Sequence, residues 1–484
     1  MKVSLLVEPE LEFGGLGRHI DIKFGIMDYG PFDYGSTVAP REIKVGVIGT
    51  PETIEGVTIW FERCRGEITA KKSKQPHLFP RFPGFNPDNG FRATLLIEGR
   101  LQRTIQERVF DRLAKTSELA WLVREAVQVF CDELEHLAED TRPDIVICAV
   151  PMSLLNALER DYSKGEGADD ERDDDEREAA LDFHHFLKAR AMSLGMPIQI
   201  ILPMTYDETK RRQQKGQADR IRRLQDEATR AWNIHTALYY KAGGVPWRLV
   251  RDASDLTACH VGISFYKALD GSSLLTSMAQ VFNQRGDGVI VRGGKAKISK
   301  DDRQAHLDEE DARLLLDHAL RTYKAEHKTL PARVVLHKSS SYSNGELVGF
   351  IDAIEQRDIE SLDCMSIRKG FTRLFRTAAY PPLRCTLFDL DDKHHILYTR
   401  GSVDFFTTYP GMYVPRPLEI RCERTEQTAT FLAQEILALT KMNWNNTQFD
   451  GGDPITLRAA RQVANILKYL GEDERVHPRY SFYM

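Results

Sequence analysis

The sequence predicts an α/β fold with largely buried sheets. Short segments rich in valine and isoleucine recur along the chain, and segments with helical periodicity lie between them. Alternation of this kind is typical of sheets covered by helices on both faces. The expected strands are residues 43–50, 142–151, 197–203, 258–266, 287–294 and 332–339. The expected helices are residues 101–140, 178–194, 226–242, 308–328 and 425–440.

Length and composition favour a globular protein of two or more domains. The chain has 484 residues, of which 42% are hydrophobic, so each domain can bury a full core. The boundary that the sequence offers lies near residue 250, where the glycines and proline of AGGVPWRL precede a strand-rich half. No run of roughly 18 apolar residues occurs, and acidic residues near the N-terminus argue against a signal peptide. We therefore expect a cytoplasmic protein without a membrane partner.

Charge is segregated along the chain, although the formal net charge is only −5. Residues 210–223 (KRRQQKGQADRIRR) are strongly basic, and residues 168–178 (ADDERDDDERE) are strongly acidic. The acidic run has no apolar face, so we expect a solvated surface insertion near residues 165–180. The net charge predicts no overall attraction to nucleic acid, and binding would therefore depend on local patches.

Cysteine and histidine spacing does not indicate a metal centre. The seven cysteines include no CxxC pair, and their odd number argues against a disulfide framework. Two His-His pairs occur, His184–His185 and His394–His395, but neither has a second cluster spaced to complete a site. A packed face is the favoured interpretation for both pairs.

The segment 226–242 carries the signals of a complete amphipathic helix. Asp226 begins it, apolar residues follow at i, i+3/i+4 spacing, and Gly243 ends it. Lys241 lies in the last turn, where an ammonium can complement the helix dipole or contact a phosphate, and spacing alone leaves both roles open. Upstream phenol, ammonium and amide donors would complete an anion-binding set. The members of this set are Tyr206, Lys210, Gln225 and Lys241.

Several blocks of sequence resemble short prokaryotic Argonautes, which consist of a MID and a PIWI domain. The blocks follow the family's order over nearly the whole chain, and the two longest are specific in combination. They are EPELEFG (8–14), YGP (29–31), VGVIGT (45–50), FPGF (82–85), WNIHTALYYKAGGVPWRL (232–249), NWNNTQFDGGDPITLRAARQVA (443–464) and RYSFYM (479–484). The resemblance implies an N-terminal segment and a Rossmann-like MID domain over 1–250, followed by an RNase H-like PIWI domain over 251–484.

The resemblance also assigns a role to the anion-binding set. In the family, a Tyr-x-x-x-Lys pair, a later glutamine and a lysine at the end of the next helix hold the 5′-phosphate of a guide strand. The matching positions are Tyr206, Lys210, Gln225 and Lys241. The C-terminal carboxylate, here on Met484, is expected to join this site through a bound Mg²⁺.

The nuclease site that the resemblance implies lacks its carboxylates. The family places metal-binding acids where this chain has Ser264, Ser339 and Arg461. Hydroxyls cannot supply the negative charge that two divalent ions require, and a guanidinium repels them. We therefore expect an inactive nuclease site without a catalytic metal. Other acids lie close in sequence, namely Asp301, Asp302, Asp450 and Asp453, and turn formation explains the last two.

Three functions follow from these observations. The resemblance implies a protein that loads a small guide RNA, captures complementary single-stranded DNA and activates a separate subunit in defence against plasmids or phage. That subunit would carry an APAZ domain and an effector, which is a TIR or sirtuin-like NAD hydrolase or a nuclease. The alternatives are an active guide-dependent nuclease with displaced carboxylates, and a nucleotide-binding enzyme unrelated to guides.

Overall fold

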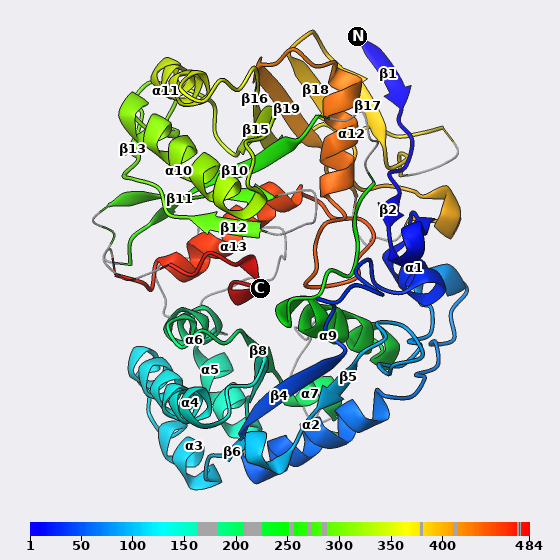
Figure 1. Ribbon diagram of the computed structural model, residues 1–484, viewed down its shortest axis with the longest axis vertical. Coiled ribbons are helices and arrows are strands. Elements are labelled where there is room, and N and C mark those ends of the chain that lie inside the picture. Colours follow the sequence, from blue (N-terminus) through cyan, green and yellow to red (C-terminus); the bar gives the residue numbers. More distant parts are fainter. Residues whose placement is uncertain are drawn as a thin grey trace.

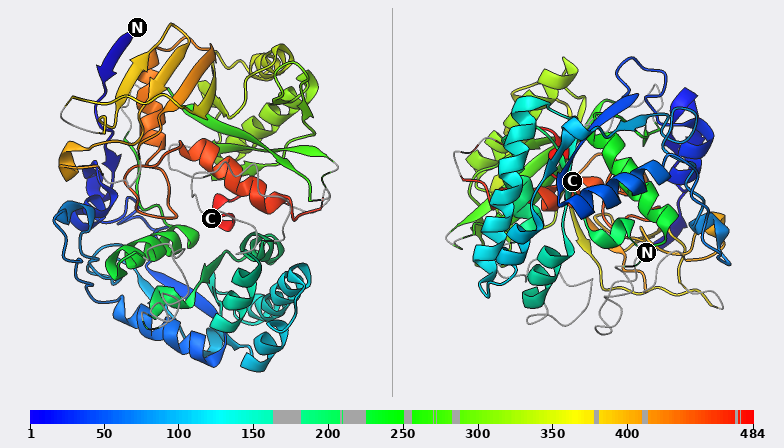
Figure 2. Two further views of the ribbon diagram at one scale, coloured as in Figure 1. Left: turned by 180° about the vertical axis from the view of Figure 1, so that it is seen from behind. Right: turned by 90° about the horizontal axis from the view of Figure 1, so that it is seen from below.

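Two lobes make up the computed structural model, each built around its own sheet (Figure 1). The last residues of the chain lie between the lobes, as the view from behind also shows (Figure 2). None of the described helices is long and apolar enough to cross a membrane. The structure describes residues 1–162, 182–207, 209, 225–250, 256–269, 271, 273–282, 288–377, 381–409, 414–471, 474 and 476–484. The acidic run at 168–178 and the basic run at 210–223 lie outside these residues.

The smaller lobe contains a parallel sheet with helices on both faces. Its strand order is β5-β4-β7-β8, and β6 pairs with the second half of β4. The strands are β4 (Glu42–Gly49), β5 (Thr94–Leu96), β6 (Gln102–Thr104), β7 (Ile145–Ala149) and β8 (Ile198–Ile201). Every residue of β7 is buried, as expected for a central strand of a parallel sheet. This arrangement confirms the predicted layers and the Rossmann-like first domain.

Alternate side chains of these strands enter two separate cores. On one face the core includes α2 (Pro51–Arg63) and α9 (Glu227–Lys241). On the other face it includes α3 (Glu107–Leu113), α4 (Leu119–Asp140), α5 (Met152–Tyr162) and α6 (Phe183–Met192). The prediction of a single helix over 101–140 is wrong, because β6, α3 and α4 divide that segment.

The larger lobe contains a nine-stranded mixed sheet in the order β1-β17-β18-β19-β16-β15-β10-β11-β12. Its strands are β1 (Lys2–Leu5), β10 (Ala258–Lys267), β11 (Leu274–Phe282), β12 (Gly288–Val291), β15 (Arg333–Lys338), β16 (Ser361–Lys369), β17 (Thr386–Asp389), β18 (His394–Leu397) and β19 (Leu418–Arg424). The central strands β10, β15 and β16 are parallel, and the outer pairs are antiparallel. Helices α10 (Glu309–His327) and α11 (Asn344–Glu355) cover one face, and α12 (Ala429–Leu439) and α13 (Ile455–Leu467) lie on the other (Figure 1).

The N-terminal segment belongs in part to this larger lobe. β1 pairs antiparallel with β17, although the predicted division places β1 with residues 1–250. A buried ion cluster holds the same segment, because Glu8 contacts Arg384 at 3.0 Å and Lys441 at 2.7 Å. Burial raises the pKa of Glu8, but these two cations outweigh it and lower the pKa overall. The first residues therefore tie the two halves of the chain together.

Gly262 of β10 allows α13 to pack directly on the sheet. A Cβ atom at this position would lie 2.1 Å from the carbonyl oxygen of Thr456, at the start of α13. We expect Gly262→Ala to lower the free energy of unfolding by about 2 kcal/mol or more, because backbone atoms must move. Urea unfolding followed by tryptophan fluorescence measures the change.

Gly345→Ala is the matched control for this substitution. The nearest atom to its added Cβ would be the Glu309 nitrogen at 3.8 Å, an ordinary contact. Alanine is also the better helix former, so stability should stay the same or rise slightly. Equal urea-unfolding midpoints for Gly262→Ala and Gly345→Ala would contradict the proposed importance of the close packing at Gly262.

Candidate functional site

Lys241 lies at the contact between the two lobes. Asp226 caps the start of α9 by accepting a hydrogen bond from the Thr229 backbone N–H at 3.2 Å, and Gly243, with φ of 93°, allows the chain to leave the helix. The ammonium of Lys241, at the end of α9, is buried. It donates to the Ile198 carbonyl at 2.8 Å, to Oε1 of Gln199 at 2.7 Å and to the main-chain oxygen of Met484 at 3.1 Å. All three N–H donors of the ammonium therefore have partners.

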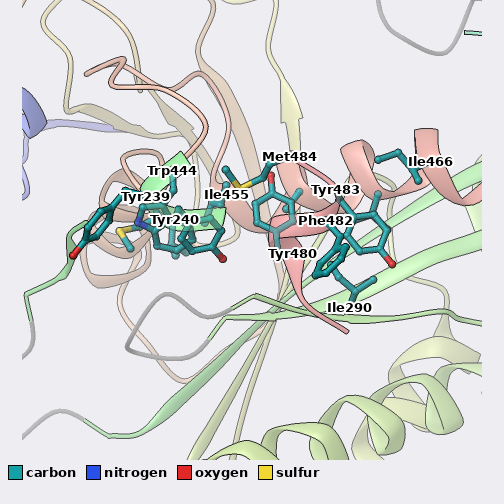
Figure 3. Close-up of a cluster of buried hydrophobic side chains, with 14 of the residues drawn as sticks. Tyr239, Tyr240, Ile290, Trp444, Ile455, Ile466, Tyr480, Phe482, Tyr483 and Met484 are labelled. Atoms are coloured by element: carbon teal, nitrogen blue, oxygen red, sulfur yellow. The ribbon is translucent and has the colours of Figure 1, made fainter. Parts of the chain in front are cut away.

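Packing of the last residues holds Met484 at this position. Figure 3 shows Tyr480, Phe482, Tyr483 and Met484 among buried side chains of both lobes. The Tyr480 hydroxyl donates to Gln462 of α13, and the Tyr483 hydroxyl donates to the His477 carbonyl at 2.9 Å. The main-chain oxygen of Met484 is thus presented to Lys241 by a fixed segment. The structure brings together these two residues of the predicted site.

A second buried lysine increases the positive charge near Lys241. Lys188 of α6 is 5% exposed, and burial lowers its pKa to about 7 despite the opposing charge of Asp182. Burial and the charge of Lys188 together lower the pKa of Lys241 well below its ordinary value. Because buried cations lack the solvation of water, an anion bound beside them would be stabilised and would favour their charged forms.

Tyr206 lies in α7 (Pro203–Tyr206) and packs against α2. A Cβ atom at Gly56 would meet the Tyr206 ring at 2.5 Å, so only glycine leaves room for the ring there. The Tyr206 hydroxyl is buried and has no hydrogen-bond partner among the described residues. Burial, with smaller contributions from Glu52 and Asp207, raises its pKa, so the hydroxyl remains a donor at neutral pH. Lys210, its predicted companion, lies outside the described residues.

Gln225 does not lie beside Lys241. It precedes the 15 residues of α9, and Lys241 is the last of them. At a rise of about 1.5 Å per residue, more than about 20 Å of helix separates the two. Gln225 is exposed, and its Oε1 accepts a hydrogen bond from Asn233 at 2.9 Å. The prediction that both residues contact one phosphate is therefore wrong.

Gln199 is the amide that the structure places next to Lys241. It belongs to β8, where Oε1 accepts from the ammonium and the side chain is half-buried. The sequence contained a signal for it, because Gln199 is the single polar residue within the apolar segment PIQIILP. A polar residue inside a buried strand indicates a site residue more strongly than a polar residue in a loop does.

The expected nuclease positions Ser264 and Ser339 lie at the same edge of the larger sheet. Ile263 of β10 pairs with Lys338, the last residue of β15, in parallel register. Ser264 and Ser339 are the residues that follow this pair along the chain. Ser264 is buried, and the Ser339 carbonyl accepts a hydrogen bond from Arg368 at 3.2 Å. The topology therefore brings together two positions that the sequence singled out separately.

Arg461, the third expected position, forms an ion pair with Asp453. Burial raises the pKa of Asp453, but Arg461, Lys369 and Arg458 outweigh it, and the pKa is lowered overall. The carboxylate of Asp453 is thus neutralised by guanidinium and ammonium groups. A divalent ion at this carboxylate would have to displace Arg461.

Two of the other acids considered from the sequence, Asp302 and Asp450, have protein partners. Asp302 contacts His306 at 2.9 Å and accepts from the Ser341 hydroxyl at 2.8 Å. Asp450 is buried, burial raises its pKa, and it accepts from Gln448 at 3.1 Å. Within the described ranges, the one group of three potential metal ligands found is Asp182, His184 and His185, which lies in α6 and at its start.

Comparison with solved structures identifies proteins of the same fold. A structure of Clostridium butyricum Argonaute bound to a guide DNA with 5′ deoxycytidine and a 19-mer target DNA has a TM-score of 0.61 and 14% identity, over 97% of this chain and 53% of that chain. Aa-Ago with externally bound siRNA has a TM-score of 0.58 and 15% identity, over 98% and 54%. A. aeolicus Argonaute has a TM-score of 0.57 and 14% identity, over 99% and 54%.

These similarities show that the chain has the mixed α/β architecture of Argonaute MID and PIWI domains. The chain spans only about half the length of these proteins, 53–54%. No protein-family model matches the sequence, and no curated protein matches it. The similarity is therefore one of fold.

Proposed function

We propose that this chain binds a 5′-phosphorylated small guide RNA and uses it to recognise complementary single-stranded DNA. The observation that carries the proposal is the buried Lys241 at the lobe contact, beside Met484 and Lys188, in a chain with the Argonaute fold. C. butyricum Argonaute, which has that fold, is bound to a guide DNA and a target DNA in its solved structure. Phosphate contacts would position the guide, and base pairing would read the target sequence.

The phosphate would contact Lys241, Gln199 and Tyr206. Because the Lys241 donors are all in use, the phosphate would replace Oε1 of Gln199 as an acceptor. The Gln199 amide could then turn its N–H donors towards the phosphate. The unpartnered Tyr206 hydroxyl would supply another donor, and Lys210 a further charge. Hydrogen bonds between charged groups are stronger than neutral ones, which favours this exchange.

A Mg²⁺ ion is also proposed at the guide phosphate. The terminal carboxylate of Met484 would supply a hard oxygen ligand, the kind that Mg²⁺ prefers. Mg²⁺ in proteins is commonly held by one or two carboxylates together with substrate phosphates, so the residues here fit an ion that binds with the guide. Its contribution would be to neutralise charge between the phosphate and the Met484 carboxylate.

Guide binding is tested by comparing short RNAs that differ only at the 5′ end. The full chain should bind a 5′-phosphorylated RNA more tightly than the same RNA with a 5′-hydroxyl, in fluorescence anisotropy at one salt concentration. Nucleic acid that copurifies with the protein should carry 5′-phosphates. Equal affinity for both ends, with no copurified nucleic acid, would favour the nucleotide-binding alternative.

We further propose that the chain does not cut its target. The support is the pair of serines at the sheet edge and the ion pair between Arg461 and Asp453. Purified protein with guide and Mg²⁺ or Mn²⁺ should leave a complementary DNA intact on a denaturing gel. A guide-dependent product that Ser264→Ala and Ser339→Ala variants also make would instead support the alternative, a nuclease with displaced carboxylates.

A chain that cuts nothing needs a partner to produce a response. We propose an APAZ-containing effector subunit, with an NAD hydrolase as the favoured output, acting in cytoplasmic defence against plasmids or phage. The proposed subunit would cover the part of a guide–target duplex that these two lobes do not contact. The chain's net charge of −5 also suits a protein that binds nucleic acid only at a local site.

A further inference from the structure

We propose that Asp182, His184 and His185 bind a divalent transition-metal ion such as Zn²⁺. The ligand atoms of these three residues all lie within 4.8 Å of one another. Imidazole nitrogens favour Zn²⁺, Ni²⁺ or Cu²⁺ over Mg²⁺ or Ca²⁺, so the ion differs from the one proposed at the guide phosphate. The inference does not rest on the proposed function.

The distances suit a tetrahedral ion. Zinc lies about 2.0–2.2 Å from nitrogen and oxygen ligands, which places two ligands of a tetrahedron about 3.4 Å apart. Nδ1 of His185 lies 3.4 Å from Oδ2 of Asp182. The His184 and His185 rings are nearly perpendicular, with centroids 5.4 Å apart. Rotation of the His184 side chain would bring the three ligand atoms around one ion, and water would occupy the fourth position.

Secondary structure explains why His184 and His185 can share one ion, whereas His394 and His395 cannot. His184 and His185 lie in the first turn of α6, and Asp182 is the N-cap residue, accepting from the His185 backbone N–H at 3.1 Å. The cap therefore fixes the carboxylate beside the histidines.

His394 and His395 lie in β18, where successive side chains point to opposite faces. Accordingly, His394 contacts Asp391 at 2.8 Å, whereas His395 contacts Asp389 at 2.7 Å. The sequence predicts the same packed face for both pairs, because their sequences are alike. The two pairs differ in the structure because His184 and His185 lie in a helix, whereas His394 and His395 lie in a strand.

The site lies where the two lobes meet. The Asp182 backbone N–H donates to the Tyr469 hydroxyl at 2.8 Å, and Phe186 stacks on the Tyr469 ring with centroids 5.3 Å apart. Tyr469 follows α13 of the larger lobe, so a bound ion would stabilise the start of α6 against it. His184 is exposed, and Asp182 and His185 are half-buried, so an ion can enter from solvent. Lys188 and Lys468 interact with Asp182 and reduce the affinity for a cation.

Metal binding is measured on the metal-free full-length chain by competition with a chromophoric zinc chelator. We expect about one equivalent of Zn²⁺ to bind and to raise the melting temperature, and excess Mg²⁺ not to displace it. His184→Ala and His185→Ala should each weaken binding by at least about tenfold and remove the thermal shift. Asp182→Asn should also weaken it, although asparagine keeps the helix cap.

His394→Ala is the matched control, because it removes one histidine of the pair that the strand separates. It should leave Zn²⁺ affinity and the thermal shift unchanged. Each variant is first melted without metal, so that a folding defect is recognised separately. Failure of the wild-type chain to bind Zn²⁺, or equal binding by all four variants, would overturn the proposal, whatever the outcome of the guide assays.

Discussion

Replacing Lys241 by methionine is expected to weaken binding of a 5′-phosphorylated guide by about 10- to 100-fold. The ammonium lies beside the Met484 main-chain oxygen and a second buried lysine, so its loss removes a charged contact worth about 1.5–3 kcal/mol. A 5′-hydroxyl guide makes no such contact, and its affinity should hardly change. Fluorescence anisotropy with both guides gives the two affinities from one preparation. Combining Lys241→Met with Lys210→Ala should abolish the preference for the phosphate.

A buried lysine outside the site provides the control for this experiment. Lys23 is 8% exposed, and its ammonium donates to the Leu78 carbonyl at 2.9 Å, so Lys23→Met makes a similar chemical change in the interior. This variant should keep the full preference for 5′-phosphate. A Lys241→Met protein that melts like the wild type and still distinguishes the two guides would exclude Lys241 from the phosphate site.

The strands of the two central sheets were predictable because burial on both faces produces continuous apolar segments. Residues 145–149 and 333–338 are fully buried, and both fall inside predicted strands. Shorter strands were missed, including Lys2–Leu5, because four residues at a sheet edge carry little periodicity. The segment 101–140 looked helical throughout, but pairing of Gln102–Thr104 with β4 overrides that local preference.

The candidate site was predictable only where a single element contains the signal. Lys241 could be recognised because the start and end of its helix are both marked in the sequence. The prediction for Gln225 is wrong because residues at opposite ends of a long helix lie far apart. The amide beside Lys241 instead belongs to Gln199, on a neighbouring strand. The grouping of Asp182 with His184 and His185 depends on a cap hydrogen bond, which the sequence alone does not reveal.

If the proposed function holds, a complementary DNA target is expected to switch on the proposed effector subunit. Coexpression with the product of the neighbouring gene should give a heterodimer with low activity when only guide is bound. Adding matched single-stranded DNA should raise NAD consumption, or nuclease activity for a nuclease effector, by at least about tenfold. Such a change needs only about 1.4 kcal/mol of differential binding between the inactive and active arrangements.

Two controls decide whether the switch belongs to this chain. A DNA of scrambled sequence has the same charge and length, so it tests base pairing rather than phosphate contacts. The Lys241→Met heterodimer should need more guide to reach the same activity, because the switch requires a positioned guide. By linkage, a target that favours the active arrangement must bind that arrangement more tightly than the inactive one. A mutation that locks the effector inactive should therefore lower the affinity for the target. Activity that ignores the matched DNA, or that persists in the effector subunit alone, would show that this chain is not the sensor.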